Sequence, residues 1–359
     1  MNIIYTCLTV FLLAFFCVYS ITPYIIKFAY KTKFMDNPNI RKVHKISTPL
    51  LGGLAVFTGF SILAVYIILT NLHLFNKPIT GYLIGALIIV VIGMIDDKYG
   101  MNPLCKLLGQ GLSCFVFIYS NDLLTLFGPA YITVPLLFFW MVGLMNALNF
   151  LDNMDGIITG MSGILALGFY AFSFISKTPA LAPQSNFMSL LSLIFAGSVF
   201  GFLPYNFNPA KIFLGDAGSM FIGYFLSTMG ILAGRLAVIR LNNNLYYLLP
   251  ILLLSYAIFD ISLVSFTRKR DGRKISQGGK DHSTHRIDNA MGSPKVTALI
   301  VYLININIVL VTILVFKIQS DKLLIISVVL FATVFIFFGK KLDQIPITIP
   351  SNQMKTIKE

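Results

Sequence analysis

The chain has 359 residues, of which 57% are hydrophobic and only 11% are charged. Soluble globular domains carry about a quarter charged residues, so this composition excludes an ordinary soluble fold and indicates a protein that crosses a membrane several times. Lys and Arg total 27 against 14 for Asp and Glu, which gives a net charge of +13. The basic excess lies mainly in short connections between apolar stretches, where it acts as a topology signal.

Eleven apolar stretches come close to the roughly 20 residues that a helix needs to cross a bilayer. The fourth is the weakest, because it is short and carries Lys106 near its start. We therefore expect an all-α polytopic helical bundle, with a single membrane domain over residues 1–340 and a tail over 341–359. In chain order, the expected helices are Ile3–Lys27, Leu50–Thr70, Ile79–Ile95, Leu104–Tyr119, Ile132–Phe150, Gly156–Ile175, Met188–Leu203, Ser219–Ile239, Leu245–Phe266, Val296–Phe316 and Leu323–Phe338.

Basic residues separate the two faces of this bundle. Most of them lie in the connections 31–49 and 268–294 and in the C-terminal tail, which share one face if there are eleven spans. The positive-inside rule then predicts that the N-terminus is outside and the C-terminus is cytoplasmic. This basic inner face could serve topology alone, or it could also attract anionic headgroups and anionic substrates.

Acidic residues are scarce, and Glu359 is the only glutamate. The notable aspartates follow odd-numbered spans and so share the predicted cytoplasmic face: Asp96, Asp97, Asp152, Asp155, Asp216 and Asp281. We interpret this distribution as one site that is assembled from several loops. These loops are expected near residues 28–49, 96–106, 150–156, 204–218 and 267–295.

Asp96 and Asp97 end the third expected helix, where the helix dipole is negative. Two adjacent carboxylates are disfavoured there unless a cation joins them. An exposed polar stop to the helix is the alternative. We favour a functional role because the dipole argues against a passive one.

Asn149, Asp152 and Asp155 follow one another at intervals of three residues, so on a helix they share a face. Two carboxylates and an amide on one stripe would make a surface that attracts cations. The alternative is an ordinary turn or helix cap at Asp155 and Gly156. That alternative explains Asp155, but it does not explain Asp152 and Asn149 at the end of an apolar span.

Asp216 stands just before the eighth expected helix, with glycines on either side. An Asp at this place is a natural N-cap. The glycines also let a ligand approach the backbone, and a helix N-terminus is a good place for a phosphate. A carboxylate beside such a phosphate needs a bridging Mg²⁺, so Asp216 is the candidate metal ligand.

His282 and His285 lie in the longest basic connection, between Lys280 and Arg286. Two histidines without cysteines are weak evidence for zinc, so an anion-binding segment is the better interpretation. A solvated basic loop is the alternative. Asp260, inside the ninth expected helix, is either functional or paired with a nearby Arg.

Five ordered motifs between about Arg41 and Arg286 resemble the polyprenyl-phosphate N-acetylhexosamine-1-phosphate transferases, and this likeness is closest to the N-acetylglucosamine branch. The motifs are Arg41-Lys42-Val43-His44 followed by Thr48-Pro49-Leu50-Leu51-Gly52-Gly53, Ile95-Asp96-Asp97, the run from Asn149 to Gly156, the run from Asn206 to Ser219, and His282 with His285-Arg286. Each motif alone is weak. All five in this order are a specific signal.

The resemblance implies ten or eleven spans, in the plasma membrane, with an active site open to the cytoplasm. The implied reaction is Mg²⁺-dependent, with Mn²⁺ as a substitute, and moves a sugar 1-phosphate from a UDP-sugar to undecaprenyl phosphate while UMP leaves. The partners are then the UDP-sugar, undecaprenyl phosphate and membrane lipid, with a second copy of the chain as a candidate and no nucleic acid.

The resemblance also implies roles for individual residues. Asp216 matches the magnesium-ligand position, and Asp96 and Asp97 match an aspartate pair near the lipid phosphate, which either of the two could position or deprotonate. These three aspartates are the expected catalytic residues. The remaining matched residues form the expected substrate-binding set: Lys45, on a looser alignment, and Asn149, Asp152, Asp155, Asn206, His282, His285 and Arg286.

Three other interpretations compete with this one. The N-acetylglucosamine branch usually has His-x-His-His-Arg, and here Thr284 replaces the middle histidine, so the muramoyl-pentapeptide branch stays an alternative. A CDP-alcohol phosphotransferase is rejected because Ile158 and Thr159 replace the Ala-Arg that its motif requires. A secondary transporter would place acidic residues near the bilayer midplane and not at one face.

Overall fold

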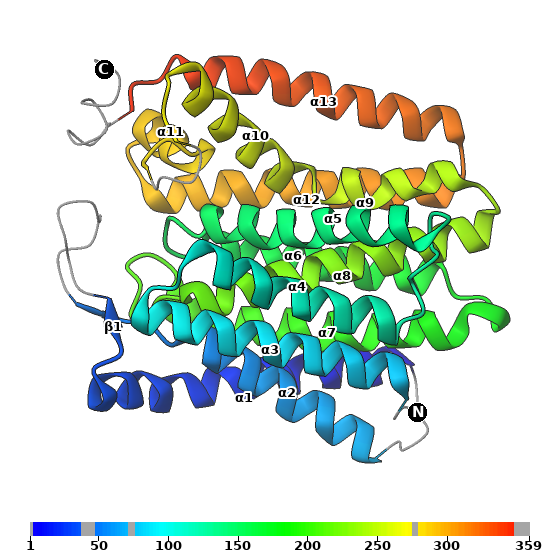
Figure 1. Cartoon of the computed structure of the whole chain (residues 1–359), viewed down its shortest axis with the longest axis horizontal. Coiled ribbons are helices and arrows are strands. Elements are labelled where there is room, and N and C mark those ends of the chain that lie inside the picture. The colour runs from blue at the N-terminus through cyan, green and yellow to red at the C-terminus, as the bar shows by residue number, and fades with distance from the viewer. Residues whose placement is uncertain (1–2, 37–46, 71–75, 275–278, 348–359) are drawn as a thin grey trace.

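The structure, a computed structural model, describes residues 3–36, 47–70, 76–274 and 279–347. Over these ranges the chain is almost entirely helical, and Figure 1 shows the long helices lying side by side. The described residues form ten helices that are long and apolar enough to cross a membrane, or eleven spans if one bent pair counts as one. This result confirms the expected polytopic helical bundle. The orientation of its termini across the membrane stays a prediction.

The helices follow the expected order, with small differences at their ends. α1 runs five residues beyond the expected end, α4 forms a full helix despite Lys106, and α13 continues past the expected domain end at residue 340. The long helices are α1 (Ile3–Thr32), α2 (Gly52–Thr70), α3 (Lys77–Tyr99), α4 (Pro103–Ser120), α5 (Ala130–Leu151), α6 (Ile157–Ile175), α7 (Ala182–Asn206), α8 (Gly215–Leu241), α12 (Pro294–Ile318) and α13 (Asp321–Asp343). The chain also forms two short 3₁₀ turns, η2 (Pro179–Leu181) and η3 (Asn244–Tyr247), and one antiparallel pair, β1 (Met35–Asp36) with β2 (Thr48–Pro49).

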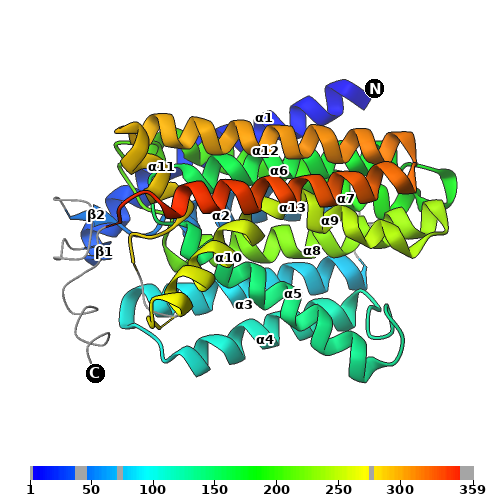
Figure 2. The same cartoon turned by 90° about the horizontal axis from the view of Figure 1, so that it is seen from above.

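The expected ninth span is broken into two helices. α9 (Leu248–Leu253) continues from η3, and α10 (Ser255–Arg270) then turns away by 70°. The long basic connection that follows contains a further helix, α11 (Ser283–Met291), which the apolar pattern of the sequence did not predict. Figure 2 shows α11 at the same end of the bundle as β1 and β2.

α8 is the central helix, because 78% of its most apolar stretch of 18 residues is buried inside the protein, against 22% for α13. It packs against α2, α3, α5 and α6, while α1 and α7 pack together beside them. Glycines permit the closest approaches: a Cβ on Gly53 of α2 would lie 2.1 Å from the backbone N of Gly218, and a Cβ on Gly93 of α3 would lie 2.3 Å from Cα of Ala217. Small residues at such crossings let membrane helices approach backbone to backbone.

The connections that carry the motifs meet at one end of the bundle. Figure 1 shows the turns after α3, α5 and α7 at the end where α11 and β1 lie, with the N-terminus at the opposite end. Each of these turns is far from the others in sequence. The expected convergence of several loops on one face of the membrane domain is therefore a property of the fold.

We predict that Gly53→Ala destabilises the protein by about 1–3 kcal/mol, the usual cost of forcing an extra methyl into a packed contact. The new methyl would meet only backbone atoms of α8, which cannot rotate away. Thermal unfolding in detergent measures the loss. Gly143→Ala in α5 is the matched control, because its Cβ would meet nothing within 4 Å; equal unfolding temperatures for the two variants would contradict the prediction.

Candidate active site

Three charged side chains from α3, α4 and α8 meet at this end of the bundle. The ammonium nitrogen Nζ of Lys106 lies 2.8 Å from Oδ2 of Asp96 and 2.6 Å from Oδ2 of Asp216. Asp96 and Lys106 are largely buried, while a third of the Asp216 side chain is exposed. The sequence predicts a cation beside the aspartate pair, and the Lys106 ammonium supplies one positive charge there.

Asp97 has a different positive partner from Asp96. Its carboxylate accepts hydrogen bonds from the backbone N–H groups of Asp216, at 2.8 Å, and Ala217, at 3.1 Å. These donors belong to the N-terminus of α8, which has no side-chain cap of its own. Asp216 is therefore not the N-cap of its helix, and the phosphate expected at this N-terminus would find two of its donors already engaged.

Asn149, in the last turn of α5, completes the surroundings of Asp216. Its Nδ2 donates to Oδ1 of Asp216 at 2.9 Å and to the hydroxyl of Ser219 at 2.8 Å. One carboxylate oxygen of Asp216 is therefore held by an amide and the other by Lys106. This arrangement orients the carboxylate while leaving part of it open to a ligand.

The expected helical stripe of Asn149, Asp152 and Asp155 is wrong, because α5 ends at Leu151. Asp152 and Asp155 lie in the turn before α6, which begins after Gly156 at a positive φ of 74°. Burial, with the nearby charge of Asp216 as the next cause, raises the pKa of Asp152 well above its usual range. No hydrogen bond joins its side chain to another described residue, so a cation or a ligand hydroxyl would find an unoccupied acceptor there.

Asp155 and Asn206 both hold the segment before α8. Asp155 accepts hydrogen bonds from Nδ2 of Asn208 at 2.9 Å and from the backbone N–H of Ala210 at 3.0 Å. Asn206 is buried, donates to the carbonyl of Ile212 at 3.0 Å and accepts from a buried threonine hydroxyl at 2.7 Å. Both side chains fix the segment that leads into α8, and direct contact with a substrate stays a prediction for both.

α11 brings the histidine segment against the end of α5. His282 is buried, its Nδ1 lies 2.8 Å from Oδ2 of Asp260, and its ring centroid is 6.5 Å from that of Phe150. Thr284, which replaces the middle histidine of the expected motif, donates to Oδ1 of Asn153 at 2.7 Å. Asp260 is therefore partnered by a histidine, and the pairing with an Arg that the sequence left open is not what the structure shows.

Three arginines anchor this segment. Arg268 and Arg273 both pair with Asp281, at 2.6 and 2.7 Å, and these contacts lower the pKa of Asp281 to about 2 despite its burial. Arg286 is buried and donates to the carbonyls of Asp281 and Leu342 at 3.0 Å each. The expected phosphate contact of Arg286 stays a prediction, and its guanidinium already joins α11 to α13.

The surroundings of His285 favour the neutral form of its ring. Burial, together with the nearby His282 and Lys280 side chains, lowers the pKa of His285 to about 4, so its ring is neutral near pH 7. A neutral imidazole offers one donor and one acceptor nitrogen to a ligand. It is therefore suited to a hydroxyl or an amide of a sugar and less suited to holding a phosphate by charge.

Lys45, the last of the expected substrate-binding residues, lies outside the described residues. Lys106 is a candidate functional residue that the sequence motifs do not point to. A charged residue inside an apolar helix is itself a signal of function, and the sequence contains that signal.

The donor set around Lys106 also fits a divalent cation. Carboxylate oxygens of Asp96 and Asp216 converge on one positive group, and oxygen is the ligand that Mg²⁺ prefers. No group of three or more His, Cys, Asp or Glu side chains gathers to hold a metal within the described ranges. The protein would therefore supply only part of the coordination, and substrate phosphate oxygens the remainder.

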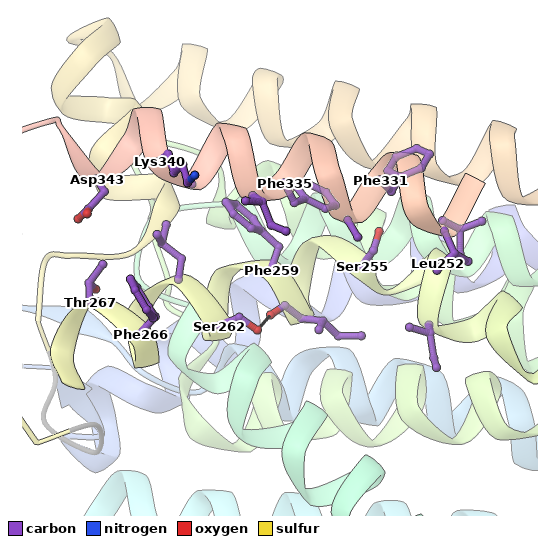
Figure 3. Close-up of a pocket in the computed structure, with 17 residues that line it drawn as sticks. Leu252, Ser255, Phe259, Ser262, Phe266, Thr267, Phe331, Phe335, Lys340 and Asp343 are labelled. Atoms are coloured by element: carbon purple, nitrogen blue, oxygen red, sulfur yellow. Dashed lines mark hydrogen bonds between the residues drawn. The ribbon is translucent and has the colours of Figure 1, made fainter. Parts of the chain in front are cut away.

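A separate groove of about 480 Å³ lies between α10 and α13 (Figure 3). Phe259 and Phe266 of α10 and Phe331 and Phe335 of α13 line it, with Lys340 and Asp343 towards one end. Most of its lining is apolar, and Asp96, Lys106 and Asp216 are not part of it. At one end Asp343 accepts a hydrogen bond from Arg286 at 3.3 Å, so the groove borders the histidine segment.

Comparison with known proteins identifies relatives of this chain. The model of glycosyl transferase family 4 matches residues 79–234. The chain is 34% identical over 304 residues to a probable undecaprenyl-phosphate N-acetylglucosaminyl 1-phosphate transferase of Bacillus subtilis. The matched region covers 82% of this chain and 80% of that protein. The chain is also 30% identical over 298 residues to a decaprenyl-phosphate N-acetylglucosaminephosphotransferase of Mycobacterium tuberculosis, covering 74% and 72% of the two chains.

A phospho-N-acetylmuramoyl-pentapeptide-transferase of Enterococcus faecalis is 32% identical over 216 residues, which cover 55% of this chain and 64% of that one. The matches to the N-acetylglucosamine enzymes are longer, and they leave less of either chain uncovered. From its aspartate motifs, its helical membrane bundle and these relatives, we conclude that the chain belongs to glycosyl transferase family 4.

Proposed function

We propose that this protein transfers N-acetylglucosamine 1-phosphate from UDP-N-acetylglucosamine to undecaprenyl phosphate, giving undecaprenyl-diphosphate-N-acetylglucosamine and UMP. The observation that carries the proposal is the convergence of Asp96, Lys106 and Asp216 at one end of a membrane bundle. With a divalent cation bound by the two carboxylates, such a site would suit two anionic substrates, one of which is a lipid. The names of the two longer-matching relatives supply the sugar and the class of acceptor.

A related N-acetylhexosamine is the second candidate substrate. The specific observation in its favour is the shorter match to the pentapeptide transferase, whose name specifies a muramoyl sugar. Both candidates share the same chemistry, because a lipid phosphate replaces UMP on the phosphorus that bears the sugar.

The reaction brings two phosphate groups together, and their negative charges must be neutralised. We expect the Lys106 ammonium, which lies beside Asp96 and Asp216, to share part of this charge. Asp96 and Asp216 would hold Mg²⁺, which when bound neutralises the diphosphate and polarises the phosphorus that is attacked. Mn²⁺ offers similar chemistry to the same oxygens.

An oxygen of the lipid phosphate forms the new bond to the phosphorus bearing the sugar, and the bond from that phosphorus to the UMP oxygen breaks. A phosphate monoester has its second pKa near about 6, so it is mostly ionised already and a base need do little. Both carboxylate oxygens of Asp97 accept hydrogen bonds from the N-terminus of α8. We therefore expect Asp97 to orient the site. A double displacement through an aspartyl-phosphate is the alternative, and isolating phosphorylated protein after incubation with donor alone would favour it.

The proposal also places the active site at the cytoplasmic side of the plasma membrane. Support comes from the basic residues of the connection 268–294, which lie at the same end of the bundle as the aspartates. Cysteine labelling from either side of the membrane, with single cysteines in place of Lys98 and of Lys177, tests this sidedness. Equal labelling of the two positions from one side would contradict it.

The decisive test is a donor panel of UDP-sugars, incubated with purified protein, Mg²⁺ and undecaprenyl phosphate. We expect release of UMP and a labelled lipid product from UDP-N-acetylglucosamine, with both lost when Mg²⁺ is chelated. Preference for a muramoyl-pentapeptide donor would favour the second candidate. Substrate movement across vesicles without UMP release would indicate a transporter and overturn the proposal.

We predict that Asp216→Asn abolishes transfer and leaves the fold intact, because the amide keeps the shape but loses the charge that a metal ligand needs. Turnover is measured at a fixed Mg²⁺ concentration, together with thermal unfolding. Asp122→Asn is the matched control, since Asp122 is an exposed residue paired with Lys77 at the opposite end of α3. Wild-type turnover of Asp216→Asn would remove this carboxylate from the site.

We predict that Lys106→Met lowers kcat by about 10²–10³-fold, the usual loss when one preorganised electrostatic contact to the transition state is removed. Methionine keeps most of the length of the side chain but leaves Asp96 and Asp216 without their shared cation. Lys77→Met provides the control, because its ion pair with Asp122 is exposed to solvent and therefore weak. Equal activities of these two variants would contradict the assignment.

A further inference from the structure

Asp260 is buried in α10, and its two carboxylate oxygens have different partners. Oδ2 lies 2.8 Å from Nδ1 of His282, whereas Oδ1 accepts the backbone N–H of Ser283 at 2.8 Å and the Ser283 hydroxyl at 2.6 Å. We propose that Asp260 is a positioning residue, which fixes the orientation and the tautomer of His282 for transfer. This inference rests on the proposed function, in which His282 belongs to the nucleotide-sugar site.

The hydrogen bonds determine which ring nitrogen carries the proton. An ionised carboxylate only accepts hydrogen bonds, so the His282 nitrogen that faces it, Nδ1, must be the donor. Nε2 is then left either with a lone pair in the neutral ring or with a second N–H in the imidazolium that the carboxylate stabilises. A partner on one nitrogen of a histidine sets the state of the other in this way.

The free nitrogen of His282 is available to a ligand. Nε2 makes no hydrogen bond to a described residue. It is also not completely buried, so a ligand could reach it. The ring lies beside Phe150, the residue after Asn149, whose amide holds Asp216. The position of His282 is therefore tied to the aspartate site through the end of α5.

The surrounding residues make Asp260 rigid. Tyr256, one turn earlier in α10, is fully buried, and its hydroxyl lies 3.0 Å from the Ser283 hydroxyl. Asp281, next to His282, is clamped by Arg268 and Arg273. The carboxylate and the ring therefore have little freedom to separate, which is what a positioning contact needs.

Asp260→Asn tests the inference because the structure dictates how the amide must sit. The backbone N–H of Ser283 can only donate, so the amide oxygen has to face it. The amide NH₂ group then faces Nδ1 of His282 and requires a lone pair there. The ring proton must move to Nε2, so the variant is expected to carry the opposite tautomer with almost no change in shape.

Nitrogen-15 NMR of protein labelled at histidine reads the tautomer directly. The chain has only four histidines, and the His282 signal is identified by its loss in His282→Gln. We expect neutral His282 to be protonated at Nδ1 in the wild-type protein and at Nε2 in Asp260→Asn. Protonation at Nε2 in the neutral wild-type ring would overturn the inference, even if the variant failed to fold.

UMP release provides the functional readout. We expect Asp260→Asn to lower kcat/KM by about 10- to 100-fold, the usual loss when a partner that orients a histidine is removed. In the His282→Gln background the same change should cost almost nothing more, because Asp260 acts through that ring. Asp122→Asn serves again as the control, and fully additive losses in the double variant would overturn the inference.

The two hypotheses fail in different ways. Absence of UMP release by the wild-type protein would contradict the proposed function and would leave the tautomer measurement unaffected. Normal UMP release by both wild type and Asp260→Asn would contradict the positioning role and leave the proposed function standing.

Discussion

Carboxylates gathered at the end of an apolar bundle need positive partners, and the arrangement of this site follows from that need. An uncompensated buried charge costs several kcal/mol. The protein meets the requirement in two ways, with the Lys106 ammonium between Asp96 and Asp216 and with the N-terminus of α8 at Asp97. These contacts join α3, α4 and α8, so the charges that would serve the chemistry also fix the helices that carry them.

Close packing makes these contacts possible. Asp97 reaches the first N–H groups of α8 because Gly93, one turn earlier in α3, lies against the backbone of Ala217. Gly53 of α2 approaches Gly218 in the same region. A side chain at either glycine would push α8 away from the carboxylate that caps it, so the packing of small residues and the electrostatics of the site depend on each other.

The histidine segment is built on a second charge network at the same end. Arg268 and Arg273 clamp Asp281, while Asp260 holds His282. Asp260 and Arg268 of this second network lie on α10, which is bent by 70° away from α9. The broken span therefore gives a helix that carries buried charges beside α11, and it brings the far end of the chain against residues from its middle.

The sequence by itself determined the polytopic helical class, the order of the long helices and the gathering of the aspartate motifs at one end. Those features follow from local apolar length and from the odd number of spans that precede each motif. It did not predict the break at Leu254, because the apolar run continues through that residue. It did not predict the helix α11, because that segment is mostly polar.

Only the tertiary structure decided the partners. Asp97 caps a helix that begins more than a hundred residues later, Asp216 is held by Asn149 and Lys106, and Asp260 pairs with His282 and not with an arginine. Residue types and spacing identify groups that need a partner. Which group satisfies the need depends on helix packing in three dimensions, and that packing is set by contacts between residues distant in the sequence.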